Sequence, residues 1–176
     1  MVEPIPIYAE GIHVMNLDGN VSLIIIFEYL DKEKYYAKLV KKGGSELINE
    51  LRIVMENMQK FLDEEIIKIN DVKVQPKVHD VTLGFRGSIE RPYLEFYISL
   101  TGGLLRKGLN RYDNWYEEEV TEYDYEILWI FPENFKITNY DLGGESIIVG
   151  SGNILRTIVK KGTKVGGHEW IEWIIP

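Results

Sequence analysis

One stretch of this 176-residue chain has clear helical periodicity, and strand-like segments lie on both sides of it. Apolar residues recur at helical spacing from Ser45, a good N-cap, to Leu62, and charged or amide side chains occupy the opposite face. A single apolar stripe is typical of a helix packed on a sheet. One helix among many strands argues against alternating βαβ units and predicts an α+β fold.

Strands are expected before the helix. Residues 12–16 and 21–30 flank Asp18-Gly19, a residue pair that favours a tight turn, and therefore predict a β-hairpin. A charged turn at residues 31–34 leads to a third expected strand, residues 35–40. Gly43-Gly44 then separates this strand from the helix.

Beyond the helix, strand-like segments follow one another between glycine, proline and asparagine residues. We expect a long strand from about residue 116 to 131 and a closing hairpin of residues 154–160 with 168–175. The predicted architecture is one domain, residues 1–176, with three strands, one long amphipathic helix and then mainly antiparallel strands. About eight to ten strands would form a curved sheet or a partly open barrel against the helix.

Composition excludes several classes of protein. The chain has no cysteine, which rules out disulfide scaffolds, thiolate metal sites and cysteine nucleophiles. Its net charge of −8 argues against coating nucleic acid or an anionic membrane. The start lacks the basic and apolar regions of a signal peptide, and the longest aliphatic and aromatic run, residues 23–27, is too short to span a membrane. We therefore expect a cytoplasmic protein, and abundant isoleucine, lysine and glutamate suggest a hot environment.

Residues 104–131 combine charged and aromatic side chains more densely than any other segment. The first half is basic and aromatic, whereas residues 117–126 contain six acids and no base. Binding surfaces usually occur on long polar segments of this kind, so we expect a protein or small-molecule partner here. The candidate binding residues are Arg106, Lys107, Arg111, Tyr112, Trp115, Tyr123 and Tyr125.

The acidic half raises a further hypothesis. On a regular strand, Glu118, Glu122 and Asp124 would project from one face and could bind a divalent metal that supports catalysis. The alternative is a solvated strand whose acids pair with Arg106, Lys107 and Arg111. Because six acids follow these few bases, nucleic acid is not an expected partner.

Local catalytic motifs are absent from the sequence. His13, His79 and His168 lack the spacing of metal ligands, and we expect surface or hydrogen-bonded histidines. The chain contains neither a phosphate-binding loop of the Walker type nor a nucleophile elbow. These observations favour a non-catalytic binding module over an enzyme, and the sequence identifies no cofactor.

Residues 12–62 provide the alternative hypothesis. Their expected hairpin, third strand and glycine-preceded helix are similar in pattern to the start of FMN-binding split-barrel proteins. This resemblance implies an enzyme that holds a flavin or similar ligand in a barrel cleft and acts as a dimer. A homodimer is also suggested by the hydrophobic residues 169–175, which must lie inside a sheet or pair with another subunit. Burial inside the sheet is the favoured explanation.

Overall fold

Over residues 3–176, which the computed structural model describes, the protein is mostly β with two helices. The larger sheet contains seven strands in the order β11-β12-β9-β1-β2-β6-β5. Neighbouring strands are antiparallel except β1 and β9, which are parallel. The bounds of these strands are β1 Ile5–Met15, β2 Val21–Leu30, β5 Gln75–Phe85, β6 Pro92–Thr101, β9 Asp124–Ile130, β11 Glu145–Val149 and β12 Ile154–Val159.

The smaller sheet contains five antiparallel strands in the order β10-β14-β7-β3-β4. A separate two-stranded ribbon pairs β13 with β8. The bounds are β3 Ile66–Ile69, β4 Val72–Lys73, β7 Gly108–Trp115, β8 Glu119–Val120, β10 Lys136–Asp141, β13 Lys164–Val165 and β14 Glu169–Ile175. The predicted α+β class with mainly antiparallel strands is confirmed, but the strands form two main sheets instead of one barrel.

The predicted N-terminal hairpin is confirmed by the pairing of β1 with β2. Gly19 adopts a positive φ of 86° in the turn, where the absence of a Cβ removes the steric penalty. The side chain of Asp18 accepts a hydrogen bond of 2.9 Å from the backbone N–H of Asn20. These local interactions hold the turn.

The prediction of a third strand at residues 35–40 is wrong, because α1 (Tyr35–Lys42) occupies this segment. The carboxylate of Asp31 accepts a hydrogen bond of 3.0 Å from the backbone N–H of Tyr36, in the first turn of the helix. Tyr36 and Leu39 are three residues apart and both are buried. The split-barrel resemblance therefore loses the strand on which its pattern depended.

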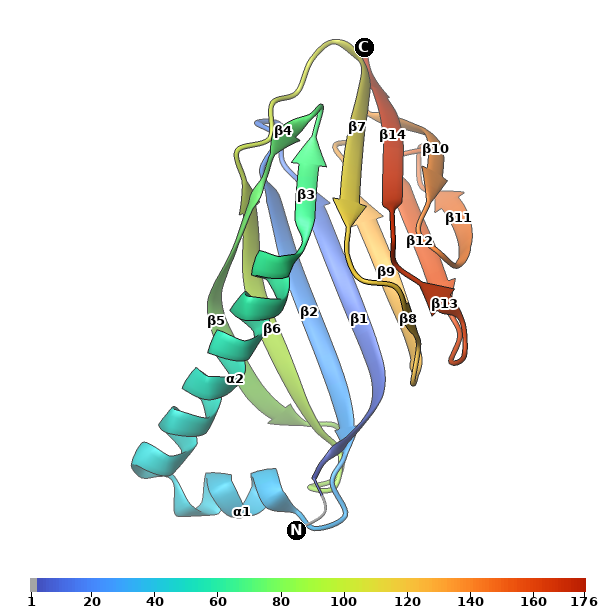
Figure 1. Cartoon of the computed structure of the whole chain (residues 1–176). Helices are drawn as coiled ribbons and strands as arrows, with labels where there is room; N and C mark the ends of the chain where they lie inside the picture. Colours follow the sequence, from blue (N-terminus) through green and yellow to red (C-terminus); the bar gives the residue numbers. More distant parts are fainter. Residues whose placement is uncertain (1–2) are drawn as a thin grey trace.

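The predicted amphipathic helix is confirmed as α2 (Gly44–Glu64), but it is the second of two helices. Figure 1 shows α2 and the five-stranded sheet on the same side of the seven-stranded sheet. Gln59 attaches α2 to β5 by accepting a hydrogen bond of 2.8 Å from the Val78 N–H. Of the α2 side chains only Leu62 is fully buried, and Ile48 and Phe61 are 69% and 68% exposed.

Two further expectations need correction. The long strand predicted at residues 116–131 is interrupted between β8 and β9, where buried Thr121 donates a hydrogen bond of 2.8 Å to the Lys160 carbonyl. The expected closing hairpin is also wrong, because β12 and β14 belong to different sheets. Each strand finds its partners elsewhere in the chain.

The core between the two sheets is rich in aromatic residues. Trp129 and Phe131 from the larger sheet side pack near Trp173 of β14, with centroid distances of 5.5 Å for Trp129–Phe131 and 4.9 Å for Phe131–Trp173. Ile171 and Trp173 are fully buried because β14 lies between β10 and β7. Burial inside a sheet therefore accounts for the hydrophobic C-terminal strand without a second subunit.

Among residues 3–176, neither helix combines the length and the apolar character that crossing a membrane would require.

Candidate functional site

A cleft of about 270 Å³ lies between the two sheets beside the C-terminal end of α2. One wall comes from β1, β2 and β9, and the other comes from β3, β7, β14 and the residues that follow α2 and β7. The alternation of each strand directs every second side chain into the cleft. The apolar lining residues include Leu23, Ile25, Phe27, Leu62, Ile67, Leu100, Ile127 and Leu142.

Four buried or half-buried polar side chains meet at one end of this cleft. Asn114 of β7 donates a hydrogen bond of 2.9 Å to the carboxylate of Glu65, the residue that ends α2. The hydroxyl of Tyr116 donates a hydrogen bond of 2.5 Å to Glu169, the first residue of β14. Asn114 and Glu169 are only 8% and 7% exposed. We call Glu65, Asn114, Tyr116 and Glu169 the polar end.

The carboxyl groups of the polar end are shifted towards their neutral forms. Burial raises the pKa of Glu169 to about 7, and the nearby charges of Glu65 and Asp141 contribute, whereas the Tyr116 hydrogen bond acts in the opposite direction. Burial also raises the pKa of Glu65, against the effect of the Asn114 hydrogen bond. Titratable groups shifted in this way inside a cleft are typical of functional sites.

His13 of β1 lines the same cleft and stacks on Trp129 of β9, with ring centroids 4.3 Å apart. Burial lowers its pKa to about 4, so the imidazole is neutral at physiological pH. Its Nδ1 has no hydrogen-bond partner among the residues that the structure describes. The expectation of an ordinary surface or hydrogen-bonded histidine holds for His79, bonded to Ser99 at 2.7 Å, whereas His13 is half-buried and forms hydrogen bonds with the backbone of Gly11 and Leu128.

A second cavity of about 310 Å³ lies under α2, next to the cleft. Phe27 and Tyr123 line both spaces. Apart from Asn57, the lining is apolar and aromatic, with Val54, Met58 and Phe61 on the helix side and Leu94 and Phe96 on the sheet side. We call the cleft and this second cavity together the groove.

Part of the segment predicted to bind a partner lines the groove. Tyr112 faces the cleft from β7, Tyr125 faces it from β9, and Tyr123 lies where the cleft and the second cavity meet. Tyr112 packs on Trp129 at a centroid distance of 4.6 Å. Three of the seven candidate binding residues therefore come together inside the molecule.

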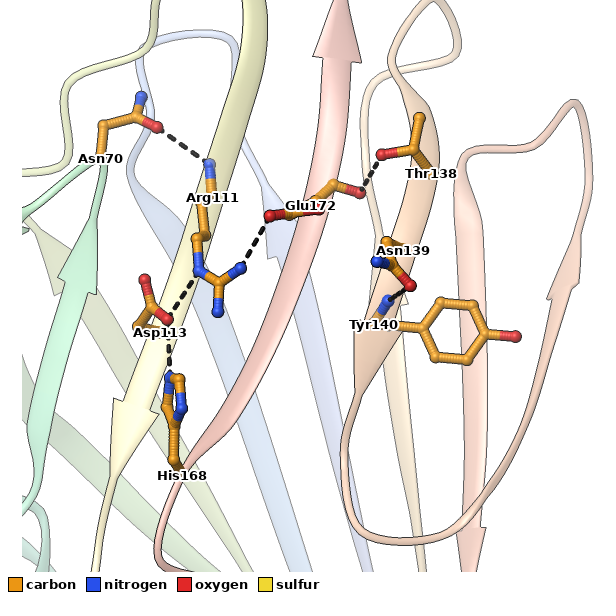
Figure 2. A network of polar contacts seen from close by, with 8 residues as sticks. All are labelled: Asn70, Arg111, Asp113, Thr138, Asn139, Tyr140, His168 and Glu172. Carbon is orange, nitrogen blue, oxygen red and sulfur yellow. Dashed lines mark hydrogen bonds and ion pairs between the residues drawn. The ribbon is translucent and has the colours of Figure 1, made fainter.

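Arg111 and Trp115 lie on the opposite face of β7. Figure 2 shows Arg111 between Asp113 and Glu172, with hydrogen bonds of 2.8 Å and 2.7 Å. Its guanidinium also lies 4.4 Å from the centre of the Trp170 ring. His168 contacts Asp113 at 2.7 Å and stacks on Trp115 at 4.6 Å. These side chains are tied to one another, and their role in binding a partner stays a prediction.

Arg106 and Lys107 are exposed in the loop before β7. The Arg106 side chain donates a hydrogen bond of 2.9 Å to the Leu109 carbonyl, while its backbone N–H donates to Asn110. Asn110 is buried and also donates to two carbonyls of this loop. The loop that carries Arg106 and Lys107 ends where β7 begins at Gly108.

The candidate metal ligands do not converge. Glu118 pairs with Lys164 at 2.7 Å, and Asp124 pairs with Lys160 at 3.1 Å. Glu122 is exposed in the break between β8 and β9. Within residues 3–176 no three histidine or carboxylate side chains are arranged to hold a metal ion. Glu118 and Asp124 therefore pair with lysines, although these are not the bases expected from the sequence.

Sequence reasoning missed the polar end. Glu65, Asn114 and Glu169 are far apart in the chain, and each occurs in a segment without a recognisable motif. One signal was available, because Asn114 alternates with Tyr112 and both belong to the segment chosen for its aromatic residues. The carboxylates that approach it could be found only from the pairing of β3 and β14 with β7.

Comparisons with known proteins assign no family. No family model matches the sequence, and no curated protein matches it. The folded domain of Mycobacterium tuberculosis LppM has a TM-score of 0.48 and 13% identity, with 99% of this chain and 93% of that chain covered. A putative protease from Parabacteroides distasonis has a TM-score of 0.36 and 7% identity, and this chain spans only 41% of it. Function must therefore be argued from the chain's own geometry.

Proposed function

We propose that this protein is a non-catalytic module that binds a small, largely apolar molecule in the groove. The observation that supports this proposal is the pair of mainly apolar cavities that lie side by side and share Phe27 and Tyr123 as lining residues. Small-molecule sites usually have volumes of roughly 300–1,000 Å³, apolar walls and a few polar groups. The groove has these properties, with its polar groups gathered at one end.

The energetic driving force would come from the groove walls. Ile25 and Phe27 are only partly buried, although both pack against the core. Covering such surface contributes roughly 25 cal/mol for each Å² of apolar area removed from water. A half-open groove of this volume suits a small molecule better than a protein partner, whose interface would require a broad accessible surface.

A cavity-filling variant tests the proposal. Ile25→Trp places an indole in the cleft and should weaken binding of the neutral fluorescent probe N-phenyl-1-naphthylamine by at least about tenfold, because the two occupy the same space. Probe fluorescence in a titration measures this affinity. Circular dichroism establishes that the variant retains its sheet content.

Ile24→Trp is the matched control. Ile24 is the neighbouring residue on β2, and strand alternation directs it to the other face of the sheet, outside the cleft lining. Its affinity for the probe should stay within about twofold of the unmodified protein. A folded Ile25→Trp protein that binds the probe as well as this control would refute the groove as the binding site.

A further inference from the structure

The charge of the cleft lining specifies its ligand further. Resting on the proposed function above, we propose that the ligand is an organic cation whose apolar body lies in the groove and whose ammonium group binds at the polar end. Several independent features of the cleft support this assignment.

The first feature is the sign of the charges. Glu65, Glu119 and Glu169 line the cleft, and no lysine or arginine of the described part of the chain lines it. Glu10 and Glu126 are register partners on β1 and β9, but strand alternation directs their side chains to the other face of the sheet, beside Tyr8. The one basic lining residue, His13, is neutral because burial lowers its pKa to about 4.

The second feature is a free acceptor. Asn114 donates through its Nδ2 to Glu65, and this hydrogen bond fixes the amide orientation. The Oδ1 of Asn114 is then left without a hydrogen-bond partner within residues 3–176, although the side chain is only 8% exposed. Buried polar groups normally have partners, so an unpaired acceptor that lines a cleft indicates a ligand that donates. An ammonium group has hydrogen atoms to give to this oxygen.

The third feature is the aromatic wall beside these acceptors. Tyrosine and tryptophan faces attract cations by a further 0.5–2 kcal/mol in typical sites, about 2- to 30-fold in affinity. Tyr112, Tyr116, Tyr123, Tyr125 and Trp129 all line the cleft. Carboxylates together with aromatic rings are the combination that recognises ammonium ions.

An organic cation fits better than a metal ion. No three histidine or carboxylate groups of the described residues are placed around one point, as a metal would require. The raised pKa of Glu169, about 7, shows that its surroundings stabilise the ionised form poorly. A monovalent ammonium group with an apolar substituent would stabilise that carboxylate and also cover the neighbouring apolar wall.

The test compares three chains of equal length that differ only in their polar group: decylammonium, decanol and decanoate. Isothermal titration calorimetry below the micelle concentration should give decylammonium the highest affinity and decanoate the lowest. Glu169→Gln should weaken decylammonium binding by at least about tenfold, because a buried charge partner is lost, while decanol affinity stays within about twofold. Glu65→Gln should act in the same direction and serves if the first variant fails to fold.

Glu145→Gln is the control, because Glu145 is an exposed carboxylate on β11 and does not line the groove. It should leave all three affinities unchanged. If decanol binds as tightly as decylammonium, or if neither buried variant alters the preference, the cation inference is wrong while groove binding stands. If none of the three chains binds, the proposed function itself is refuted.

Discussion

At the scale of single residues, the buried carboxyl of Glu169 gives a pH-dependent stability. Its pKa is raised from 4.5 to about 7, so the folded state binds this proton more tightly than the unfolded state does. The free energy of unfolding should therefore fall as the pH rises from about 4.5 to 7 and level off above, by on the order of 3 kcal/mol. Tyr116, Tyr125, Glu65 and Asp141 are the titratable groups that act on this carboxyl.

Glu169→Gln should remove most of this pH dependence, because glutamine stays neutral and can still accept the Tyr116 hydrogen bond. Urea unfolding of both proteins at pH 5 and pH 8 measures the difference, with the variant the more stable protein at pH 8. Groups that do not interact with Glu169 titrate equally in both proteins and cancel in the comparison. Equal losses of stability in the two proteins would show that Glu169 is not the titrating group.

At the scale of elements, the Asp31 carboxylate stabilises the start of α1, where Lys34 at the N-cap position makes no side-chain cap hydrogen bond. The Asp31 carboxylate accepts the Tyr36 N–H at 3.0 Å from a side chain that is only 1% exposed. Asp31→Ala should lower the free energy of unfolding by about 0.5–2 kcal/mol, the usual effect of losing a helix cap. Chemical unfolding measures this loss, and hydrogen exchange shows whether it is concentrated in α1.

Lys32→Ala provides the comparison, since Lys32 is exposed in the same turn. Its effect should be within about 0.5 kcal/mol, as for most surface substitutions. An Asp31→Ala protein as stable as the Lys32→Ala protein would mean that packing of Tyr36 and Leu39 alone holds α1.

The sequence predicts elements whose signals are local. The β1–β2 hairpin follows from Asp18-Gly19, and α2 follows from its apolar stripe, so both are confirmed. The helix α1 was missed because its residue types are typical of a strand. The hydrogen bond from the Tyr36 N–H to Asp31 and the burial of Tyr36 favour a helix instead. The break before β9 was missed because it depends on Thr121 bonding to Lys160, 39 residues away.

The site follows the same division between local and distant information. Aromatic density selected the segment that supplies Tyr112, Tyr123 and Tyr125 to the groove. It could not separate these from Arg111 and Trp115, because the face of β7 is set by register with β3 and β14. The same pairing of β3 and β14 with β7 places Glu65 and Glu169 at the cleft, and no local sequence pattern predicts this pairing.

At the scale of the whole molecule, the two sheets and α2 differ in how firmly they are held. The sheet core contains completely buried side chains such as Trp173 and Leu155. In α2, by contrast, Leu62 is the only buried side chain, and it is 5% exposed. Gln59 forms hydrogen bonds that hold the C-terminal half of α2 against β5. The N-terminal half of α2 instead follows directly after the exposed C-terminal residues of α1. Segments with few buried contacts open locally at lower free energy than the core does.

Hydrogen exchange should therefore be fastest at residues 35–55, slower at residues 56–64 and slowest in β1, β2 and β9. Because α2 forms one wall of the second cavity, a molecule that fills the groove should slow exchange in α2 as well as in β1 and β9. Mass spectrometry with and without decylammonium measures both effects.

The strand β11 serves as the internal control, because it lies at the far edge of the larger sheet and should be unaffected. If α2 exchanged as slowly as β1 and β2, the small number of buried side chains in α2 would not make it more mobile than the sheet. Protection confined to β11 would place the ligand outside the groove.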